Sequence, residues 1–321
     1  MKKILILIIV SLFCTACTNH AEKSEVLYSV IDSQGQEVAF SKKPTKILTL
    51  ALETDIITLG LVPADNLVAV NSLLTDPSVS NVAELAATVP HTITNPTAEE
   101  ILKLSPDLVI ISDWGNTEQR EILQNLGINV LVVNGAKSLS DIEANISLIA
   151  AALDEKEKGE NLLAQMDAKL AELEGKLAKL DRPKPRIALI SVMNGYGSRG
   201  TLFDDLCQKA HVINTLDEIE ITFGTKLTKE MLITLNPDIL FLPSYNNAAF
   251  DREAFIASYT DDKALSAITA IKNKELKFPR DAYIYNGSQD AVFGAWEIAA
   301  MCYGDEFLLP DGEHLSAVGL E

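Results

Sequence analysis

One helix–strand unit occurs twice in the chain. Residues 99–111 read EEILKLSPDLVII and residues 230–242 read EMLITLNPDILFL, and the two copies align without a gap at an offset of 131. Upstream of each copy stands a threonine, Thr97 or Thr228, that can cap a helix, and within each copy a Pro-Asp pair ends that helix. The strands that follow are apolar throughout, as expected of strands covered on both faces. The repeat therefore predicts two similar α/β lobes.

The rest of the chain alternates strand-like and helix-like segments. Residues 27–40 alternate apolar and polar residues around a DSQG turn, which predicts a β-hairpin. Short apolar runs predict further strands at 46–50, 67–70, 130–133 and 186–192, and a helix near 55–61. This alternation is typical of mostly parallel, Rossmann-like sheets with helices on both faces, which bind ligands at the carboxyl ends of their strands.

A long amphipathic segment separates the two copies of the repeat. Between residues 154 and 181, apolar residues recur at spacings of three and four, at Leu163, Met166, Leu170, Leu173, Leu177 and Leu180. Such spacing predicts one helix with a narrow apolar stripe, about 42 Å long at 1.5 Å per residue. A coiled-coil dimer is the alternative, but the segment has fewer than four heptads, so we favour a helix packed along both lobes.

The first residues read as an export signal. Lys2 and Lys3 precede a ten-residue apolar stretch, 4–13, which is too short to span a bilayer. The CTAC sequence that ends at Cys17 resembles the bacterial lipobox, whose cysteine is lipidated after cleavage. Its first position departs from the usual leucine. The resemblance predicts a lipid anchor on Cys17; simple secretion is the alternative.

These features define the predicted organisation of the whole chain. They divide it into a signal peptide (1–16), a lipidated tether (17–25), an N-terminal lobe (26–153), a linking helix (154–181), a C-terminal lobe (182–303) and a C-terminal tail (304–321).

Charge and cysteine content narrow the classes of partner. The formal net charge is −18, which disfavours nucleic acid and gives no attraction to anionic lipid. Beyond Cys17, the cysteines Cys207 and Cys302 have no metal-site or redox spacing. We expect free thiols, although a disulfide stays open. No resident metal site and no cofactor are predicted.

Two aromatic residues follow the duplicated strands at matched positions. Trp114 and Tyr245 share the offset of the repeat, so we expect them to face each other across a cleft. Flat aromatic faces suit a large, partly apolar ligand such as a corrin, a porphyrin or a catecholate complex. Packing of each ring on its own lobe is the alternative.

Other candidate ligand-binding residues follow other predicted strands. Arginine offers a planar donor fork to carboxylates or to the negative oxygens of an iron complex, although an arginine in an acidic protein is often paired at the surface. These candidates are Leu52, Glu53, Tyr196, Arg199, Arg280 and Tyr283.

Together, the lipobox, the hairpin, the duplicated unit and the long helix resemble one family. It is the iron-complex, haem and cobalamin group of ABC-importer binding proteins, and the resemblance covers about residues 27–303. It implies two lobes joined by a stiff helix with a solute in the cleft between them, small closure, no enzymatic activity and an extracytoplasmic location on the bacterial membrane. It also implies that Glu99 and Glu230 engage arginines of the permease. One departure is at Ala210 and His211, where the family has a glycine pair.

Rival interpretations rest on weaker patterns. Gly195, Gly197 and Gly200 form a GxGxxG sequence, which suggests a dinucleotide-binding oxidoreductase. An exported protein meets little NAD, the matching loop near 51–55 has no glycines, and no catalytic acid–base set accompanies the motif.

An exported zinc or manganese receptor is the other main alternative. It would cluster histidine and carboxylate ligands, but the histidines are far apart in the sequence, at His20, His91, His211 and His314. An axial haem-ligand role for His91 or His211 stays open. No hydrolase motif is present in the sequence, and a purely structural lipoprotein would need neither the paired aromatics nor the paired glutamates.

Overall fold

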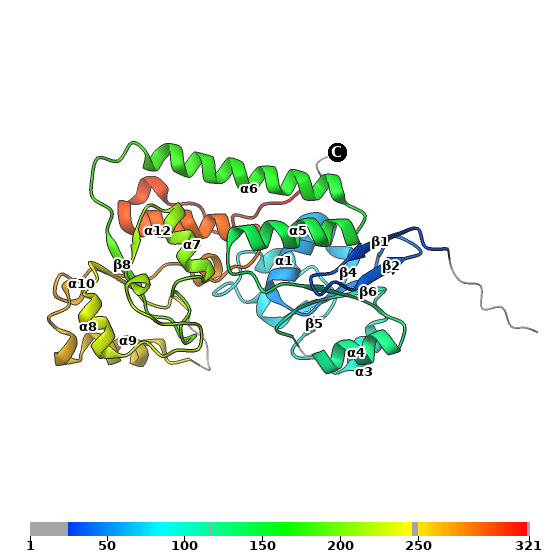
Figure 1. The fold of residues 1–321 in the computed structure, drawn as a ribbon, viewed down its shortest axis with the longest axis horizontal. Helices are drawn as coiled ribbons and strands as arrows, with labels where there is room; N and C mark the ends of the chain where they lie inside the picture. Colours follow the sequence, from blue (N-terminus) through cyan, green and yellow to red (C-terminus); the bar gives the residue numbers. More distant parts are fainter. Residues whose placement is uncertain (1–24, 116, 246–249, 320–321) are drawn as a thin grey trace, which may run out of the picture.

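Two parallel sheets with helices on both faces form two lobes that lie side by side (Figure 1). The structure, a computed structural model, describes residues 25–115, 117–245 and 250–319; Cys17, His20 and the predicted signal peptide lie outside them. The predicted α/β class with two lobes is confirmed.

The N-terminal lobe holds a five-stranded sheet in the order β5-β4-β3-β6-β7. Its strands are β3 (Ile47–Thr49), β4 (Leu67–Asn71), β5 (Thr92–Ile93), β6 (Leu108–Ser112) and β7 (Asn129–Val133). A separate antiparallel hairpin joins β1 (Tyr28–Ile31) to β2 (Glu37–Phe40). The helices are α1 (Leu52–Leu61), α2 (Ala83–Ala86), α3 (Ala98–Leu104), α4 (Thr117–Asn125) and α5 (Leu139–Ala152), with short 3₁₀ turns η1 (Ala64–Asn66) and η2 (Ser72–Thr75).

The C-terminal lobe holds a four-stranded sheet in the order β11-β10-β8-β9. Its strands are β8 (Arg186–Leu189), β9 (Ile213–Asn214), β10 (Ile239–Phe241) and β11 (Leu276–Lys277). The helices are α7 (Leu202–Lys209), α8 (Lys229–Leu235), α9 (Arg252–Thr260), α10 (Thr269–Lys272), α11 (Asp281–Ile284) and α12 (Ala291–Tyr303), with 3₁₀ turns η3 (Thr215–Glu218), η4 (Lys263–Leu265) and η5 (Asp305–Phe307).

The duplicated unit has the same local structure in both lobes. The hydroxyls of Thr97 and Thr228 accept hydrogen bonds from backbone N–H groups at the starts of α3 and α8. Both helices end in a left-handed residue, Ser105 (φ 51°) or Asn236 (φ 41°), immediately before the proline. The predicted caps and stops are therefore confirmed.

One apolar core runs under both lobes on the side of the long helix. Alternate residues of β6 point to opposite faces of the sheet: Leu108 and Ile110 join this shared core, whereas Val109 and Ile111 join a core confined to the N-terminal lobe. The C-terminal lobe has its own separate core on the matching face. The lobes are thus fused on one side and independent on the other.

The linking helix α6 (Lys156–Leu177) lies along both lobes (Figure 1). Its predicted stripe packs on the shared core, with Met166, Leu173 and Leu177 buried. It has 22 residues, which makes it shorter than the predicted 154–181. The left-handed conformation of Asp154 (φ 54°) keeps the first residues out of the helix. The long helix therefore spans about 33 Å at 1.5 Å per residue.

The segment after α12 returns to the N-terminal lobe instead of forming a tail. We call residues 304–319 the C-terminal strap. It runs beneath α6 toward the N-terminal lobe (Figure 1), where the N–H of Ala317 donates to the carbonyl of Gly60 at 2.8 Å. Phe307, Leu315 and Ala317 are buried. Because these apolar residues follow no helical or strand period, the sequence pattern did not predict that the segment packs.

Candidate ligand cleft between the lobes

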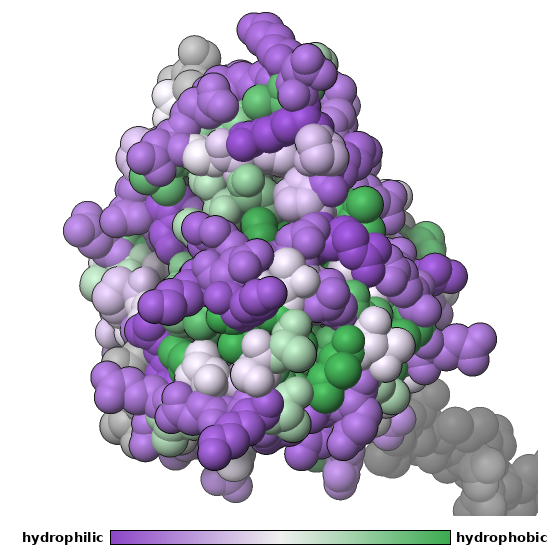
Figure 2. Space-filling view, turned by 90° about the vertical axis from the view of Figure 1, so that its left-hand side faces the viewer, coloured by the Kyte–Doolittle hydropathy of each residue, from purple (hydrophilic) through white to green (hydrophobic). Residues whose placement is uncertain are grey.

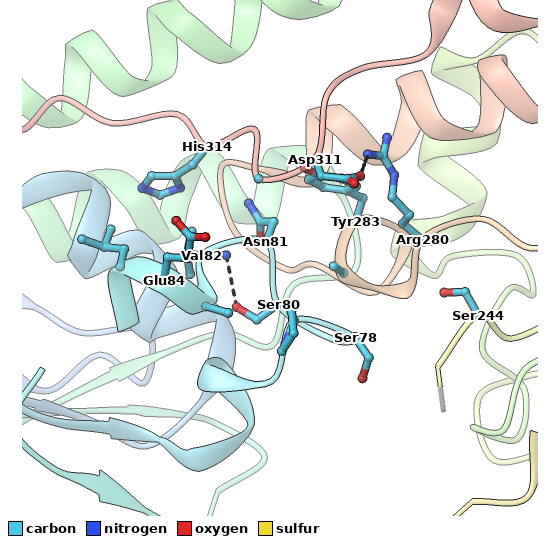
Figure 3. A pocket seen from close by; sticks show the side chains of 15 residues that line it. Ser78, Ser80, Asn81, Val82, Glu84, Ser244, Arg280, Tyr283, Asp311 and His314 are labelled. Atoms are coloured by element: carbon cyan, nitrogen blue, oxygen red, sulfur yellow. Dashed lines mark hydrogen bonds and ion pairs between the residues drawn. The ribbon is translucent and has the colours of Figure 1, made fainter. Parts of the chain in front are cut away.

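A cavity of about 770 Å³ opens between the lobes beneath the strap (Figure 3). Four segments line it: the loop before α2 with the first turn of that helix, the segment around Ser244, the start of α11, and the strap. Its polar side chains include Ser78, Ser80, Asn81, Glu84, Ser244, Arg280, Asp311 and His314. The volume lies in the range of cavities that hold small organic ligands.

The two lobes meet in direct contact beside this cavity. A Cβ added to Gly60 of α1 would lie 2.5 Å from Nε2 of Gln289, at the start of α12. That amide donates to the carbonyls of Ile56 and Leu315 at 3.0 and 3.1 Å. Gly287 also approaches Glu53 closely, since a Cβ there would lie 3.2 Å from the Cβ of Glu53. Glycine at both positions permits this close approach.

A buried polar network joins both lobes to the strap. Asp290 is fully buried and accepts hydrogen bonds from Asn81 Nδ2 at 2.7 Å and from the N–H of Leu315 at 2.8 Å. Its other close neighbour is Nδ1 of His314, at 2.7 Å. Nε2 of His314 is buried and has no hydrogen-bond partner among the described residues. This network fixes the strap at the cavity wall.

Arg280 is largely occupied by protein partners. Its Nε and Nη2 donate to Oε2 of Glu297 at 2.8 and 2.6 Å, and its Nη1 donates to Asp311 at 2.6 Å. The carbonyls of Leu309 and Pro310 accept from the same Nη1 at 3.2 Å. The guanidinium lines the cavity, yet its visible role is to hold the strap against α12. Its ligand contact stays a prediction.

Two of the three predicted tyrosines, Tyr196 and Tyr283, are packed within the C-terminal lobe. Tyr283 lines the cavity (Figure 3) but is buried, and burial raises the pKa of its phenol to about 12. Tyr196 stacks on Tyr285 at 4.6 Å and donates to the carbonyl of Ile284 at 2.6 Å. Burial raises the pKa of Tyr196 well above its usual value. Neither hydroxyl is free for a ligand without rearrangement.

Arg199 lies apart from the interlobe cavity. Its Nη2 donates to the carbonyl of Asp217 at 2.7 Å, and it lines a separate hollow beside α7 and β9. Leu52 and Glu53 begin α1, where Glu53 accepts a hydrogen bond from the hydroxyl of Ser112 at 2.6 Å. Glu53 also lies against Gly287 of the C-terminal lobe, at the contact between the lobes.

The matched aromatics occupy the carboxyl ends of the duplicated strands. Trp114 is 67% exposed and borders a recess of about 360 Å³ in the N-terminal lobe. Arg120, which the sequence reasoning missed, lines the same recess 3.6 Å from Asp32. Tyr245 stacks on Phe250 at 5.9 Å, and its N–H donates to Asp281 at 2.8 Å.

More exposed apolar residues follow other parallel strands, in both lobes. The sequence reasoning missed them because single apolar residues in loops carry no periodic signal. They are Leu73 after β4, Val192 and Met193 after β8, Phe278 after β11, and Phe223, whose loop packs at Gly195 on the loop that follows β8.

The glycine-rich loop is a tight structural turn in the C-terminal lobe. Gly195 has φ 74°, and a Cβ there would overlap the carbonyl of Thr222 and lie 2.7 Å from Cα of Phe223. The N–H of Gly224 donates to the carbonyl of Asn194 at 2.7 Å. The glycines thus join two loops at the strand ends. At the position where the family has glycine, His211 keeps a left-handed φ of 56°.

Glu99 and Glu230 are exposed, in the first turns of α3 and α8. Both helices lie on the side of their lobe away from α6 (Figure 1). In the parts of the chain that the structure describes, no group of three or more potential metal-ligating side chains comes together. Within the same residues, no helix is both long and apolar enough for a membrane span.

Two α/β lobes, a helix along both of them and a cleft between them define a two-lobed substrate-binding protein. The chain belongs to the periplasmic binding protein family, whose sequence pattern matches residues 47–282. This confirms the resemblance found in the sequence, and with it that the chain is a binding protein and not an enzyme.

Similar proteins are bacterial binding proteins. An uncharacterised ABC transporter substrate-binding lipoprotein of Bacillus subtilis, YvrC, is 24% identical over 73% of this chain and 77% of its own. A probable siderophore-binding lipoprotein of the same species, YfiY, is 24% identical over 56% of this chain and 57% of its own.

Solved structures show the same fold at low identity. The haem-binding protein RhuT from Roseiflexus superposes with a TM-score of 0.67 at 21% identity, covering 80% of this chain and 97% of that one. The molybdate-binding protein MolA from Haemophilus influenzae gives a TM-score of 0.69 at 17% identity, covering 86% of this chain and 91% of that one.

Proposed function

We propose that this protein is the extracytoplasmic receptor of an ABC importer and that it captures an organic metal complex between its lobes. A ferric siderophore is the first candidate, followed by haem and cobalamin. The family and the relatives named as substrate-binding lipoproteins support the receptor role.

The ligand class is carried by one observation: both lobes expose large apolar side chains where their parallel strands end. Trp114 is 67% exposed on one lobe and Phe223 is 66% exposed on the other. A bare metal ion or an oxyanion is held by polar groups and gains nothing from contact with an apolar surface. An organic complex with flat, partly apolar faces buries it and gains about 25 cal/mol per Å².

Charge at the cavity wall supports a neutral or cationic complex. Glu84 and Asp311 line the cavity between the lobes, and Arg280 is neutralised by Glu297 and Asp311. A strongly anionic ligand would be repelled by these carboxylates, and no unpaired positive charge of Arg280 would offset the repulsion.

A fluorescence titration of the soluble protein that lacks residues 1–17 tests this proposal. The panel comprises a ferric hydroxamate, a ferric catecholate, haemin, cyanocobalamin, molybdate and zinc. We expect saturable quenching by at least one organic complex and none by the inorganic ions. Saturation by molybdate or zinc alone would contradict the proposal.

Variants locate the binding surface. Phe223→Ser and Trp114→Ala should each weaken the best ligand about tenfold, since each loses roughly 1.4 kcal/mol of apolar contact. Leu126→Ser is the matched control: Leu126 is 53% exposed but follows α4, at the opposite edge of the sheet from the strand carboxyl ends. Equal losses in all three variants would argue against the cleft.

Attachment and docking complete the proposed role. We infer that Cys17 carries the lipid that holds the receptor at the membrane; labelling with a radioactive fatty acid should disappear in Cys17→Ala. Glu99 and Glu230 dock on the permease, so Glu99→Ala with Glu230→Ala should stop uptake while ligand affinity persists. Loss of ligand affinity in that double variant would contradict the docking role.

A further inference from the structure

Helices α3 and α8 expose an apolar side chain at the same position of the repeat. Leu102 is 38% exposed and Ile233 is 42% exposed, although each belongs to a short helix whose other face is buried. The two positions are related by the offset of 131 that relates the two copies. Each lies three residues after Glu99 or Glu230, on the same face of the helix.

Packing of the lobes does not require these two side chains. Ile101 of α3 and Leu232 of α8 are buried and join the cores that the two lobes do not share. Leu102 and Ile233 point elsewhere and leave apolar surface in water in both copies. A single exposed apolar side chain is ordinary, but the same exposure at the matched position of both copies points to a shared use.

Both side chains belong to helices that lie on the side of the molecule away from the linking helix and the strap. In Figure 1, α3 and α8 lie on the side of each lobe opposite α6. Figure 2 views the end of the C-terminal lobe, and its lower part, where α8 and α10 lie, carries apolar side chains among polar ones. In the described chain, α3 packs against α4 and α8 against η3, yet Leu102 and Ile233 stay exposed.

We propose that Leu102 and Ile233 are paired apolar anchors for the importer's permease, each entering an apolar socket rimmed by basic side chains. The inference rests on the proposed receptor function and goes beyond the glutamates. A permease built from two equivalent subunits presents its socket twice, and this receptor presents the complementary pair of anchor and carboxylate twice. The exposed carboxylates supply orientation, and the anchors supply contact that salt does not screen.

The test measures the affinity of the mature protein for the importer's permease–ATPase complex from the same organism, reconstituted in lipid nanodiscs, at low and at high salt. Leu102→Asp with Ile233→Asp should weaken binding about tenfold or more at both salt concentrations, as expected for buried interface anchors. The two single variants, Leu102→Asp and Ile233→Asp, should lose equal amounts of affinity for the permease complex, because the two positions are equivalent. Glu99→Gln with Glu230→Gln should lose affinity mainly at low salt.

Leu308→Asp is the matched control, since Leu308 is 53% exposed on the strap side of the molecule; it should bind normally. Leu102→Ser with Ile233→Ser repeats the test without added charge, and thermal unfolding verifies the fold of each variant. Wild-type affinity in both double variants, or an equal loss in Leu308→Asp, would overturn the inference. Failure of the unaltered protein to bind would instead overturn the proposed function, and the anchors with it.

Discussion

Replacing Arg280 by alanine should destabilise the C-terminal lobe severely. Glu297 is 1% exposed, and its carboxylate accepts three N–H donors, all from Arg280. Arg280→Ala removes the two side-chain donors and leaves a buried carboxylate with the backbone N–H alone. It also frees the strap, since Nη1 of Arg280 holds Asp311 and the carbonyl of Leu309.

The magnitude follows from the two lost charged hydrogen bonds. Each contributes roughly 1.5–3 kcal/mol, and breaking a buried ion pair by removing one partner costs about 3–5 kcal/mol. We therefore expect Arg280→Ala to lower the free energy of unfolding by about 4 kcal/mol. Replacing both partners, as in Arg280→Met with Glu297→Met, should recover most of this loss, because no charge then stays buried without a partner.

Urea unfolding followed by tryptophan fluorescence measures the effect. Trp296 is buried against Phe307 of the strap, with ring centroids 6.4 Å apart, so it reports on the C-terminal lobe. The measurement is made with Trp114→Phe in every protein, which removes the exposed reporter. A loss of less than about 1 kcal/mol in Arg280→Ala, or a double variant as unstable as the single one, would refute the reasoning, since a surface pair contributes only that much.

Two further predictions concern pH and backbone geometry. Burial raises the pKa of Asp55 to about 8, despite hydrogen bonds from the hydroxyl of Thr49 and the N–H of Asn71. Because this exceeds the unfolded value, the stabilising contribution is complete below about pH 4 and is lost as pH rises toward 8, at up to about 1.4 kcal/mol per pH unit. Urea unfolding at several pH values across this range should show that the free energy of unfolding changes less with pH in Asp55→Asn than in the unaltered protein. An identical pH dependence in the two proteins would contradict the prediction. Gly195→Ala should weaken ligand binding about tenfold, or roughly 1.4 kcal/mol, by displacing Phe223. The control is Gly35→Ala, because Gly35 has nearly the same φ, 75°, and a Cβ there would have no neighbour within 4 Å. Equal affinities in the two glycine variants would show that the turn does not position the binding surface.

The main architecture could be read from periodic patterns. The repeat predicted α3, β6, α8 and β10 with their caps and stops, because a threonine, a Pro-Asp pair and an apolar run each act on neighbouring residues. The spacing of leucines likewise predicted α6. In these segments the local signal and the tertiary packing agree.

The cleft was harder to predict because its chemistry depends on contacts between distant segments. Arg280 resembled a free cation in the sequence, but Glu297 and Asp311 reach it from α12 and the strap. Tyr196 is engaged by α11, which follows it by more than eighty residues. Arg120 belongs to α4 and Phe223 to a loop without a period, so only the fold shows that they lie near the strand ends.

The strap makes the order of synthesis matter for this molecule. Gly60 and Ile56 are among the earlier residues of the N-terminal lobe to be synthesised, yet the N–H that pairs with the Gly60 carbonyl belongs to Ala317, and the amide that pairs with Ile56 belongs to Gln289. The hydrogen bonds of these N-terminal-lobe carbonyls can thus form only after the end of the chain has been synthesised. A chain that lacks its last residues therefore also loses contacts in the N-terminal lobe, and the two lobes complete their folding together.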